Sequence, residues 1–522
     1  MDFQFSIIRK LSIHFALCIF ICLVFLNAGM SFAKTPHDKE KDKIHPGQES
    51  IPETHHKNHD KSPIKDQDKD LEDFFEDDIK EIPLEGDSGE LDDFFSDDKI
   101  RPDINETLDS QPSSDKTSYF FNGNIKLKTG YRFNYDSQGN RTTDHSGLSD
   151  TKAEIDLEFG SKVFESWDLF ISGSAFYNLA YEFNGRNNYT EKFLEENEKE
   201  LELDKLFIRG SLNKVLDIKI GRQIVVWGKS DNIRVTDILN PLDLREPGMT
   251  DIEDLRLPVF MTRFDYYFFN LSLSAFVIHE HRSHKTPVFG SSYFYFPNAL
   301  PDESDISTRF ENTEFALSLS GTFPGFDISF YLADIYDDSS YLNADNQKLN
   351  QRISMAGLAA NKVHGNFLYK AEIAFFNDIR LSAFPQNGVP VENLQDYSRA
   401  DFLVGIEYSG FKDTSLSFEM ADKWMTNYDH CAQNIGINEH RVQYALRVSR
   451  TFLHEVLDLT ILTSLYGKSA DDGGFIRTQG TYDLSDAISI TLGAIFYKSG
   501  SHVMLKQIGE NDAIFSSITY DF

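Results

Sequence analysis

The sequence predicts an all-β protein: a transmembrane antiparallel β-barrel of about 18 strands, with about 16 as the alternative, that follows a disordered acidic N-terminal tail. Three observations predict this fold class. Polar and apolar residues alternate with a period of two from Tyr119 onward, short and long connections alternate between these segments, and an export signal opens the chain. A wall with lipid outside and water inside needs this alternation.

Composition narrows the function before any motif is considered. The 522 residues carry a net charge of −32, and the pI is about 4.8. Nucleic-acid binding needs a basic surface, so the charge excludes nucleic acid as a partner. The mean hydropathy of −0.39 resembles that of a soluble protein. A barrel wall gives a similar average, because half of its residues face water.

The N-terminus has the pattern of a secretory signal peptide, which we place over residues 1–33. Arg9 and Lys10 precede an apolar run over 11–26, and Ser31 and Ala33 are the small residues that a signal peptidase recognises. A short membrane anchor is the alternative, but the run is shorter than the ~20 residues that span a bilayer. Cleavage leaves Cys431 as the one cysteine, so the mature chain forms no internal disulfide.

Residues 34–118 form a separate acidic segment. They contain 12 Lys or Arg against 26 Asp or Glu and few aliphatic residues, which predicts a disordered tail in the periplasm. Within it, Leu-Glu-Asp-Phe-Phe at 71–75 recurs as Leu-Asp-Asp-Phe-Phe at 91–95. Paired phenylalanines are unusual in a purely solvating spacer. We therefore predict that a periplasmic partner docks on Phe74, Phe75, Phe94 and Phe95, with a solvated spacer as the alternative.

Residues 119–522 have the pattern of the barrel itself. Over 152–159 charged residues alternate with apolar ones: Lys152 and Glu154 face one side, and Ile155 and Leu157 face the other. The segments expected to be strands are 119–133, 150–163, 168–180, 201–212, 215–227, 258–268, 271–279, 309–321, 326–336, 350–362, 367–377, 398–409, 414–422, 439–452, 457–466, 474–483, 488–497 and 512–522. Every second connection between them is short, which is typical of periplasmic turns.

The last strand ends in Tyr520, Asp521 and Phe522. Apolar residues alternate back from this terminal phenylalanine, and the pattern is similar to the signal that outer-membrane barrels present to the barrel assembly machinery. Any strand can end in phenylalanine, which is the alternative. Together with the signal peptide, Tyr520 and Phe522 predict insertion into the outer membrane, with lipid around the wall.

Two neighbouring motifs carry a family resemblance. Residues 221–228 read Gly-Arg-Gln-Ile-Val-Val-Trp-Gly, and 237–243 read Asp-Ile-Leu-Asn-Pro-Leu-Asp. This stretch resembles the proteobacterial outer-membrane β-barrel family known as domain of unknown function 1302, and more distantly the alginate-export-type porins. The detailed match covers about 221–263. The resemblance implies a monomeric barrel that works beside resistance-nodulation-division-type exporters and periplasmic lipid-handling partners. The acidic tail is not part of the family pattern.

The long connection over 228–257 is the candidate functional element. A loop of this length is seldom idle, and the third outer loop of porin-like barrels often folds inward. We expect it to narrow the lumen, with a charged constriction formed by Arg222, Lys229, Arg234, Asp237, Asp243, Arg245, Arg256 and Arg263. In the alternative, the loop caps the barrel mouth and its charges pair with each other. Arg222 raises a conflict, because it shares a strand face with Ile218, Ile220 and Ile224.

Other chemistry has weaker support. His279, His281 and His284 could bind a metal, but they lie where a strand passes into a loop, and solvated histidines are common there. The sequence contains no Gly-x-Ser-x-Gly motif, P-loop or dinucleotide fingerprint, so we expect neither an enzyme nor a cofactor. The prediction is an outer-membrane channel or transport-partner barrel. The alternative is a non-conducting structural or docking barrel that recruits a periplasmic or exporter partner through its tail.

Overall fold

The computed structural model describes residues 119–134, 143–164, 166–296, 298–304, 306, 312–343, 345–382, 395–434, 437–501, 505, 508–509 and 511–522. The predicted signal peptide and acidic tail lie outside these residues. Within the described ranges, no helix has the length and apolar character needed to cross a membrane.

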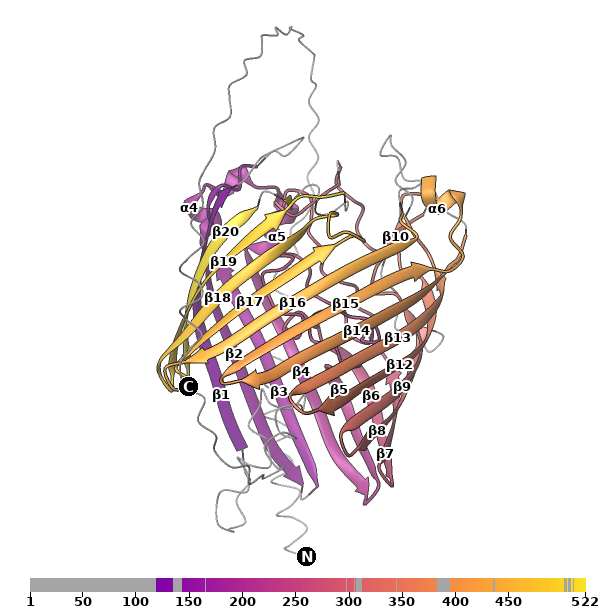
Figure 1. Cartoon of the computed structure of the whole chain (residues 1–522). Coiled ribbons are helices and arrows are strands. Elements are labelled where there is room, and N and C mark those ends of the chain that lie inside the picture. Colours follow the sequence, from indigo (N-terminus) through magenta and orange to yellow (C-terminus); the bar gives the residue numbers. More distant parts are fainter. Residues whose placement is uncertain are drawn as a thin grey trace, which may run out of the picture. The chain divides into compact units, whose positions relative to one another are not determined.

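Eighteen strands form one antiparallel sheet, as the sequence predicts. The sheet closes on itself because β1 pairs with both β2 and the last strand, β20 (Figure 1). The strands are β1 (Tyr119–Asn134), β2 (Gly147–Phe164), β3 (Trp167–Asn178), β4 (Lys199–Asn213), β5 (Leu216–Gln223), β6 (Val259–Phe268), β7 (Leu271–Ile278), β8 (Glu314–Phe323), β9 (Phe326–Tyr336), β12 (Arg352–His364), β13 (Phe367–Ile379), β14 (Tyr397–Phe411), β15 (Thr414–Met425), β16 (His440–Phe452), β17 (Leu457–Tyr466), β18 (Gly474–Ser485), β19 (Ile488–Lys498) and β20 (Asp512–Asp521).

The strand faces follow the predicted alternation. In β1, Ile125 and Leu127 are 43% and 57% exposed on the outer face, whereas Arg132 is buried on the inner face. In β2, the inward Lys152 Nζ lies 3.8 Å from Glu154 Oε1, and the outward Ile155 is 36% exposed. The exposed apolar side chains are therefore a belt around the barrel rather than a defect in its packing.

The two ends of the barrel sequence meet at the seam. The backbone N–H of Gly123 donates to the carbonyl of Phe522, and the N–H of Phe522 donates to the carbonyl of Gly123, both at 2.9 Å. A Cβ at Gly123 would lie 2.8 Å from Phe522 Cζ, so the absence of a side chain at 123 makes room for the terminal ring. The last residue of the chain thus takes part in closing the sheet.

The long connections contain small elements that the period-two pattern does not predict. These are α4 (Ala180–Phe183), η1 (Arg186–Asn188), α5 (Glu191–Asn197), β10 (Tyr341–Leu342), β11 (Lys348–Leu349) and α6 (His430–Asn434). Thr190 caps α5 by accepting a hydrogen bond from the Phe193 N–H at 3.3 Å.

The predicted strand over 215–227 was too long at its end, because β5 ends at Gln223. Gly221 has a φ of +134°, which marks a break in regular strand geometry. Beyond it, the N–H of Val225 donates to the Asn240 side chain at 2.7 Å instead of to a neighbouring strand. The chain therefore leaves the wall two residues after Gly221 and enters the barrel interior.

Candidate functional site

The connection between β5 and β6, residues 224–258, packs its apolar side chains against inward-facing wall residues. Trp227 stacks on Tyr331 of β9 with ring centroids 4.7 Å apart, and it meets Phe276 of β7 edge-on at 5.8 Å. Val225 and Ile233 join the same buried cluster, at 5% and 2% exposure. Burying a side chain of this size contributes about 1.5–3 kcal/mol, so these residues hold the loop against the wall.

One wall carboxylate receives four hydrogen bonds from the loop. Glu372 of β13 accepts the backbone N–H groups of Lys229 at 2.6 Å and Ser230 at 2.9 Å. It also accepts the N–H of Thr236 at 3.1 Å and the Thr236 hydroxyl at 2.7 Å. Loop N–H groups have no strand or helix partner, and hydrogen bonds to a carboxylate are stronger than neutral ones. Glu372 therefore fixes both ends of the segment 229–236.

A second wall carboxylate holds the middle of the same segment. Glu419 of β15, which is fully buried, accepts the backbone N–H groups of Asp231 at 2.9 Å and Asn232 at 3.0 Å. The Ser230 hydroxyl donates to it at 2.8 Å. The carboxylate of Asp231, in the same loop segment, pairs with Lys370 of β13. Glutamates of two strands thus bind one turn of the loop.

The second half of the loop binds other strands. The Asp251 carboxylate pairs with Arg447 of β16 at 3.1 Å and with Arg477 of β18. The Tyr497 hydroxyl of β19 donates to the carbonyl of Pro247 at 2.7 Å. These contacts and those of Glu372 and Glu419 attach the loop to five strands, β13, β15, β16, β18 and β19.

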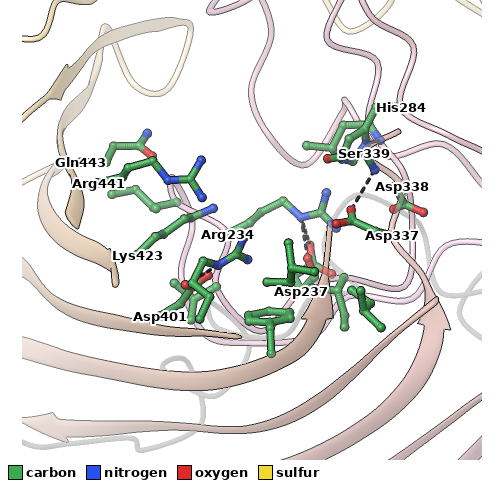
Figure 2. Close-up of a pocket in the computed structure, with 18 of the residues that line it drawn as sticks. Arg234, Asp237, His284, Asp337, Asp338, Ser339, Asp401, Lys423, Arg441 and Gln443 are labelled. Atoms are coloured by element: carbon green, nitrogen blue, oxygen red, sulfur yellow. Dashed lines mark hydrogen bonds and ion pairs between the residues drawn. The ribbon is translucent and has the colours of Figure 1, made fainter. Parts of the chain in front are cut away.

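A cavity of about 390 Å³ lies beside the loop. Figure 2 shows Lys423 and Arg441 on one side of it, and Asp337 and Asp338 on the other. The cations come from β15 and β16, whereas both acids follow β9. The cavity therefore has a cationic wall facing an acidic one. Its apolar lining includes Ile233, Val235, Ile335, Ile353, Phe376 and Ile379.

Burial shifts the titration of two loop residues at this cavity. The pKa of His284 falls to about 3, mainly because burial disfavours the charged ring, and the neighbouring Arg234 and Lys423 add to the effect. His284 Nδ1 accepts a hydrogen bond from the Leu242 N–H at 2.9 Å, as a neutral ring can. Burial also raises the pKa of Asp338 well above its usual value. The acidic wall therefore carries less negative charge than its number of carboxyl groups suggests.

The structure brings together three of the eight predicted constriction residues. Arg256 Nε lies 2.9 Å from Asp237 Oδ2, and Arg234 Nε lies 3.2 Å from the same oxygen. Arg234 also donates to the carbonyl of Asp237 at 2.7 Å. Arg234 and Asp237 line the cavity. Pairing of loop charges with each other is what the capping alternative expects.

The other predicted charges lie apart from this cluster. Arg245 pairs with Asp243 and, at 2.8 Å, with Glu200 of β4. Lys229 Nζ is 3.9 Å from Asp327 of β9. Arg263 pairs with Asp265 on its own strand, at 2.7 Å. The eight residues therefore do not form a single ring of charge.

Arg222 lies on the outward face, as the strand pattern implies. The register of β4 and β5 continues from Ser211↔Asp217 to Leu206↔Arg222 without a bulge, and the Arg222 partner on β6, Phe260, is 42% exposed. The side chain avoids an unpaired charge by donating to the Leu203 carbonyl at 2.7 Å and to Glu280 at 3.0 Å. Arg222 also lies 3.7 Å from Glu202 of β4, so its charge is paired at the end of β5 and does not join the Arg234–Asp237–Arg256 cluster.

In the described part of the chain, no three His, Cys, Asp or Glu side chains are grouped so as to hold a metal ion. Four site residues were not predicted from the sequence: Glu372, Glu419, Lys423 and Arg441. Their signal was a charged residue at an inward position of a wall strand, but the sequence does not tell which loop such a residue meets. Phe74, Phe75, Phe94 and Phe95, where docking is predicted, lie outside the described residues.

Comparisons with known proteins agree with the resemblance of the sequence. The family described as "Protein of unknown function (DUF1302)" matches residues 103–522. No curated protein matches the chain. Similar solved structures include the outer membrane protein OpdK from Pseudomonas aeruginosa, at 10% identity and TM-score 0.46, covering 78% of this chain and 99% of that one. Acinetobacter baumannii OccAB1 has 11% identity and TM-score 0.46, with 77% and 96% covered. Pseudomonas aeruginosa OccK9 (OpdG) has 11% identity and a TM-score of 0.46, and the match covers 80% of this chain and 98% of that one.

Proposed function

The chain belongs to the DUF1302 family, and from that premise we propose that it is an outer-membrane channel or transport-partner barrel whose polar lumen is narrowed by residues 228–257. The signal peptide over 1–33 would export it, and the tail over 34–118 would stay in the periplasm. The proposal includes no catalytic step and no cofactor.

The attachment of the loop to Glu372 and Glu419 carries this proposal. A loop that only capped the mouth would have no need for carboxylates of β13 and β15 as acceptors of its backbone N–H groups. Both glutamates are almost completely buried, at 4% and 0% exposure. Leaving a buried carboxylate unpaired is costly, so the loop and the wall stabilise each other in this position.

A water-filled lumen is supported by the charges on the inner face. Lys152 and Glu154 of β2, and Arg399 and Asp401 of β14, all point inward. Charged groups at this density are stable only if water or a partner solvates them, whereas the outer face has an apolar belt. The arrangement favours transport of polar or charged solutes.

A non-conducting barrel is the second candidate, and the Asp251 contacts favour it. The loop is bound at β13 and β15 and again at β16 and β18, which is an arrangement suited to a plug. In that case the tail would supply the function, by docking a periplasmic partner on Phe74, Phe75, Phe94 and Phe95. Docking by the tail stays a prediction.

Removing the loop separates these candidates. We expect purified wild-type protein to give single-channel steps in planar bilayers, and a variant with 228–257 replaced by a short Gly-Ser linker to give larger steps. Heat-modifiable gel mobility would verify that the variant is still a closed barrel. Equal conductance of the two proteins would reject narrowing. A silent wild type with a conducting variant would support the plugged barrel.

A further inference from the structure

Two cations of the cavity wall face each other across neighbouring strands. Lys423 of β15 lies directly opposite Arg441 of β16, and both side chains line the cavity (Figure 2). Like charges directly opposite on one face of a sheet repel and weaken the pairing of the strands. Among the described residues, neither side chain takes part in an ion pair or hydrogen bond. The fold therefore holds two positive charges on neighbouring strands, and neither is directly bonded to a carboxylate.

The carboxylate of Asp401 attracts both cations but is bonded to a third one. Asp401 of β14 is opposite Lys423 in register, but its Oδ1 accepts a hydrogen bond from Arg399 at 2.7 Å. The inward patch formed by Arg399, Asp401, Lys423 and Arg441 thus combines three cations with one acid. Its excess positive charge faces the cavity.

The remaining acids around the cavity are also engaged or lie on the opposite wall. Asp237 is bound by Arg234 and Arg256. Asp337 accepts the Ser339 N–H at 2.8 Å, and it lies across the cavity with Asp338. An anion that entered the cavity would therefore meet the cations of β15 and β16 without displacing an existing partner.

The two cations are within reach of a solute. Arg441 is exposed and Lys423 is half-buried, although protein atoms surround both side chains. They are enclosed by the barrel and still open to its interior. A charge in such a confined space is screened less than a charge on a free surface, and its attraction for an anion is correspondingly stronger.

The rest of the cavity is suited to an apolar group. Ile335, Ile353 and Phe376 line it, and these side chains belong to the inner face of β9, β12 and β13. Its volume of about 390 Å³ falls within the range of small-molecule sites, which combine apolar walls with a few convergent polar groups. The cavity thus offers a cationic end and an apolar side.

We propose that Lys423 and Arg441 bind the oxyanion group, a carboxylate or a phosphate, of a small amphipathic organic anion whose apolar part lies against Ile335, Ile353 and Phe376. Arg441 supplies a planar fork of donors that matches an oxyanion, and Lys423 supplies a point charge. This inference deepens the proposed channel function and rests on it only for the claim that the bound anion is cargo.

Equilibrium dialysis of the purified full-length protein tests the site without requiring conductance. The probes are benzoate, phenyl phosphate, inorganic phosphate and benzylamine. We expect benzoate or phenyl phosphate to bind the wild type, with at least tenfold weaker binding in Lys423→Gln/Arg441→Gln. Arg441→Lys, which keeps the charge, should retain part of the affinity. Arg209→Gln, which removes a lumen cation paired with Asp168, should bind like the wild type.

The benzoate and phenyl phosphate arms distinguish a carboxylate cargo from a phosphorylated one. If each anion bound the double variant as tightly as the wild type, the proposed site would be wrong. Equally tight binding of benzylamine would overturn its charge preference, and equally tight binding of inorganic phosphate would overturn the apolar contact. Binding by a protein that conducts no current would leave the site standing and reject the channel.

Stability of the ligand-free protein gives a second readout. If the two cations repel each other in an empty site, the thermal unfolding midpoint of Lys423→Gln/Arg441→Gln should equal or exceed that of the wild type. A lower midpoint would show that the cations stabilise the barrel themselves and would contradict a ligand site. This outcome also reveals whether the variant used for dialysis is folded.

Discussion

Gly228 shows how closely the loop fits the wall at the scale of single residues. Its φ is +91°, a region that residues with a side chain rarely adopt. A Cβ at this position would lie 2.7 Å from Glu372 Oε1 and 2.8 Å from Thr236 Oγ1. The residue therefore has to be glycine for two reasons, backbone conformation and the approach of the anchoring carboxylate.

The Gly228→Ala substitution should loosen the loop. We expect the backbone conformation alone to cost about 1–3 kcal/mol, with a further loss as Glu372 is displaced. Gly365→Ala is the matched control, because Gly365 also has a positive φ, of +59°, but nothing lies within 4 Å of its Cβ position. A lower thermal unfolding midpoint for Gly228→Ala than for Gly365→Ala is the expected result. Equal midpoints would argue against a tight contact with Glu372.

The sequence predicts the charged residues of the loop but not the wall residues that they contact. The charges of 228–257 were recognisable from the sequence, and Arg234, Asp237 and Arg256 do come together. Their partners were not, because Glu372 lies more than a hundred residues away, and only closure of the barrel brings it to the loop. Local alternation specifies the face on which a side chain lies but not what it meets there.

At the scale of elements, strands were more predictable than loops. A period of two leaves a direct mark on the sequence, and the turn between β8 and β9, for example, falls where Pro324 and Gly325 interrupt it. The predicted end of β5 was too late because the apolar residues 224–227 have the composition of a strand, whereas Val225 and Trp227 pack inside the barrel. Apolar side chains of an inward loop and of a strand look alike in the sequence.

The last strand provides a prediction about assembly. Phe522 joins the seam through both of its backbone hydrogen bonds with Gly123, and its ring lies 6.4 Å from Phe121. We expect Phe522→Ala to lower the amount of protein in the outer-membrane fraction, because the strand must be recognised and must also close the sheet. Phe411→Ala, which removes a 57% exposed ring at the end of β14, is the control. Wild-type abundance and gel mobility of Phe522→Ala would refute a role in assembly.

For the whole molecule, the barrel wall can be predicted from local sequence patterns, whereas the packing inside the lumen cannot. An even strand count places both ends of the described barrel at the short-turn end, and this followed from the alternation of connection lengths. The content of the lumen depends on carboxylates and arginines from many strands, which meet one loop only after closure. The sequence could indicate an inward loop from its length, but not its anchors or the cavity beside it.

In the proposed channel, Glu372 and Glu419 hold the loop inside a conducting lumen. Single-channel conductance of Glu372→Gln/Glu419→Gln in planar bilayers tests it most directly, with Asp168→Asn as a control whose carboxylate pairs with Arg209 of the neighbouring strand. We predict conductance steps of equal size from the wild type and the control. The double variant should give larger or more variable steps, because the loop loses its charged acceptors. Steps of unchanged size in the double variant, or no current from any of the three proteins, would contradict the claim.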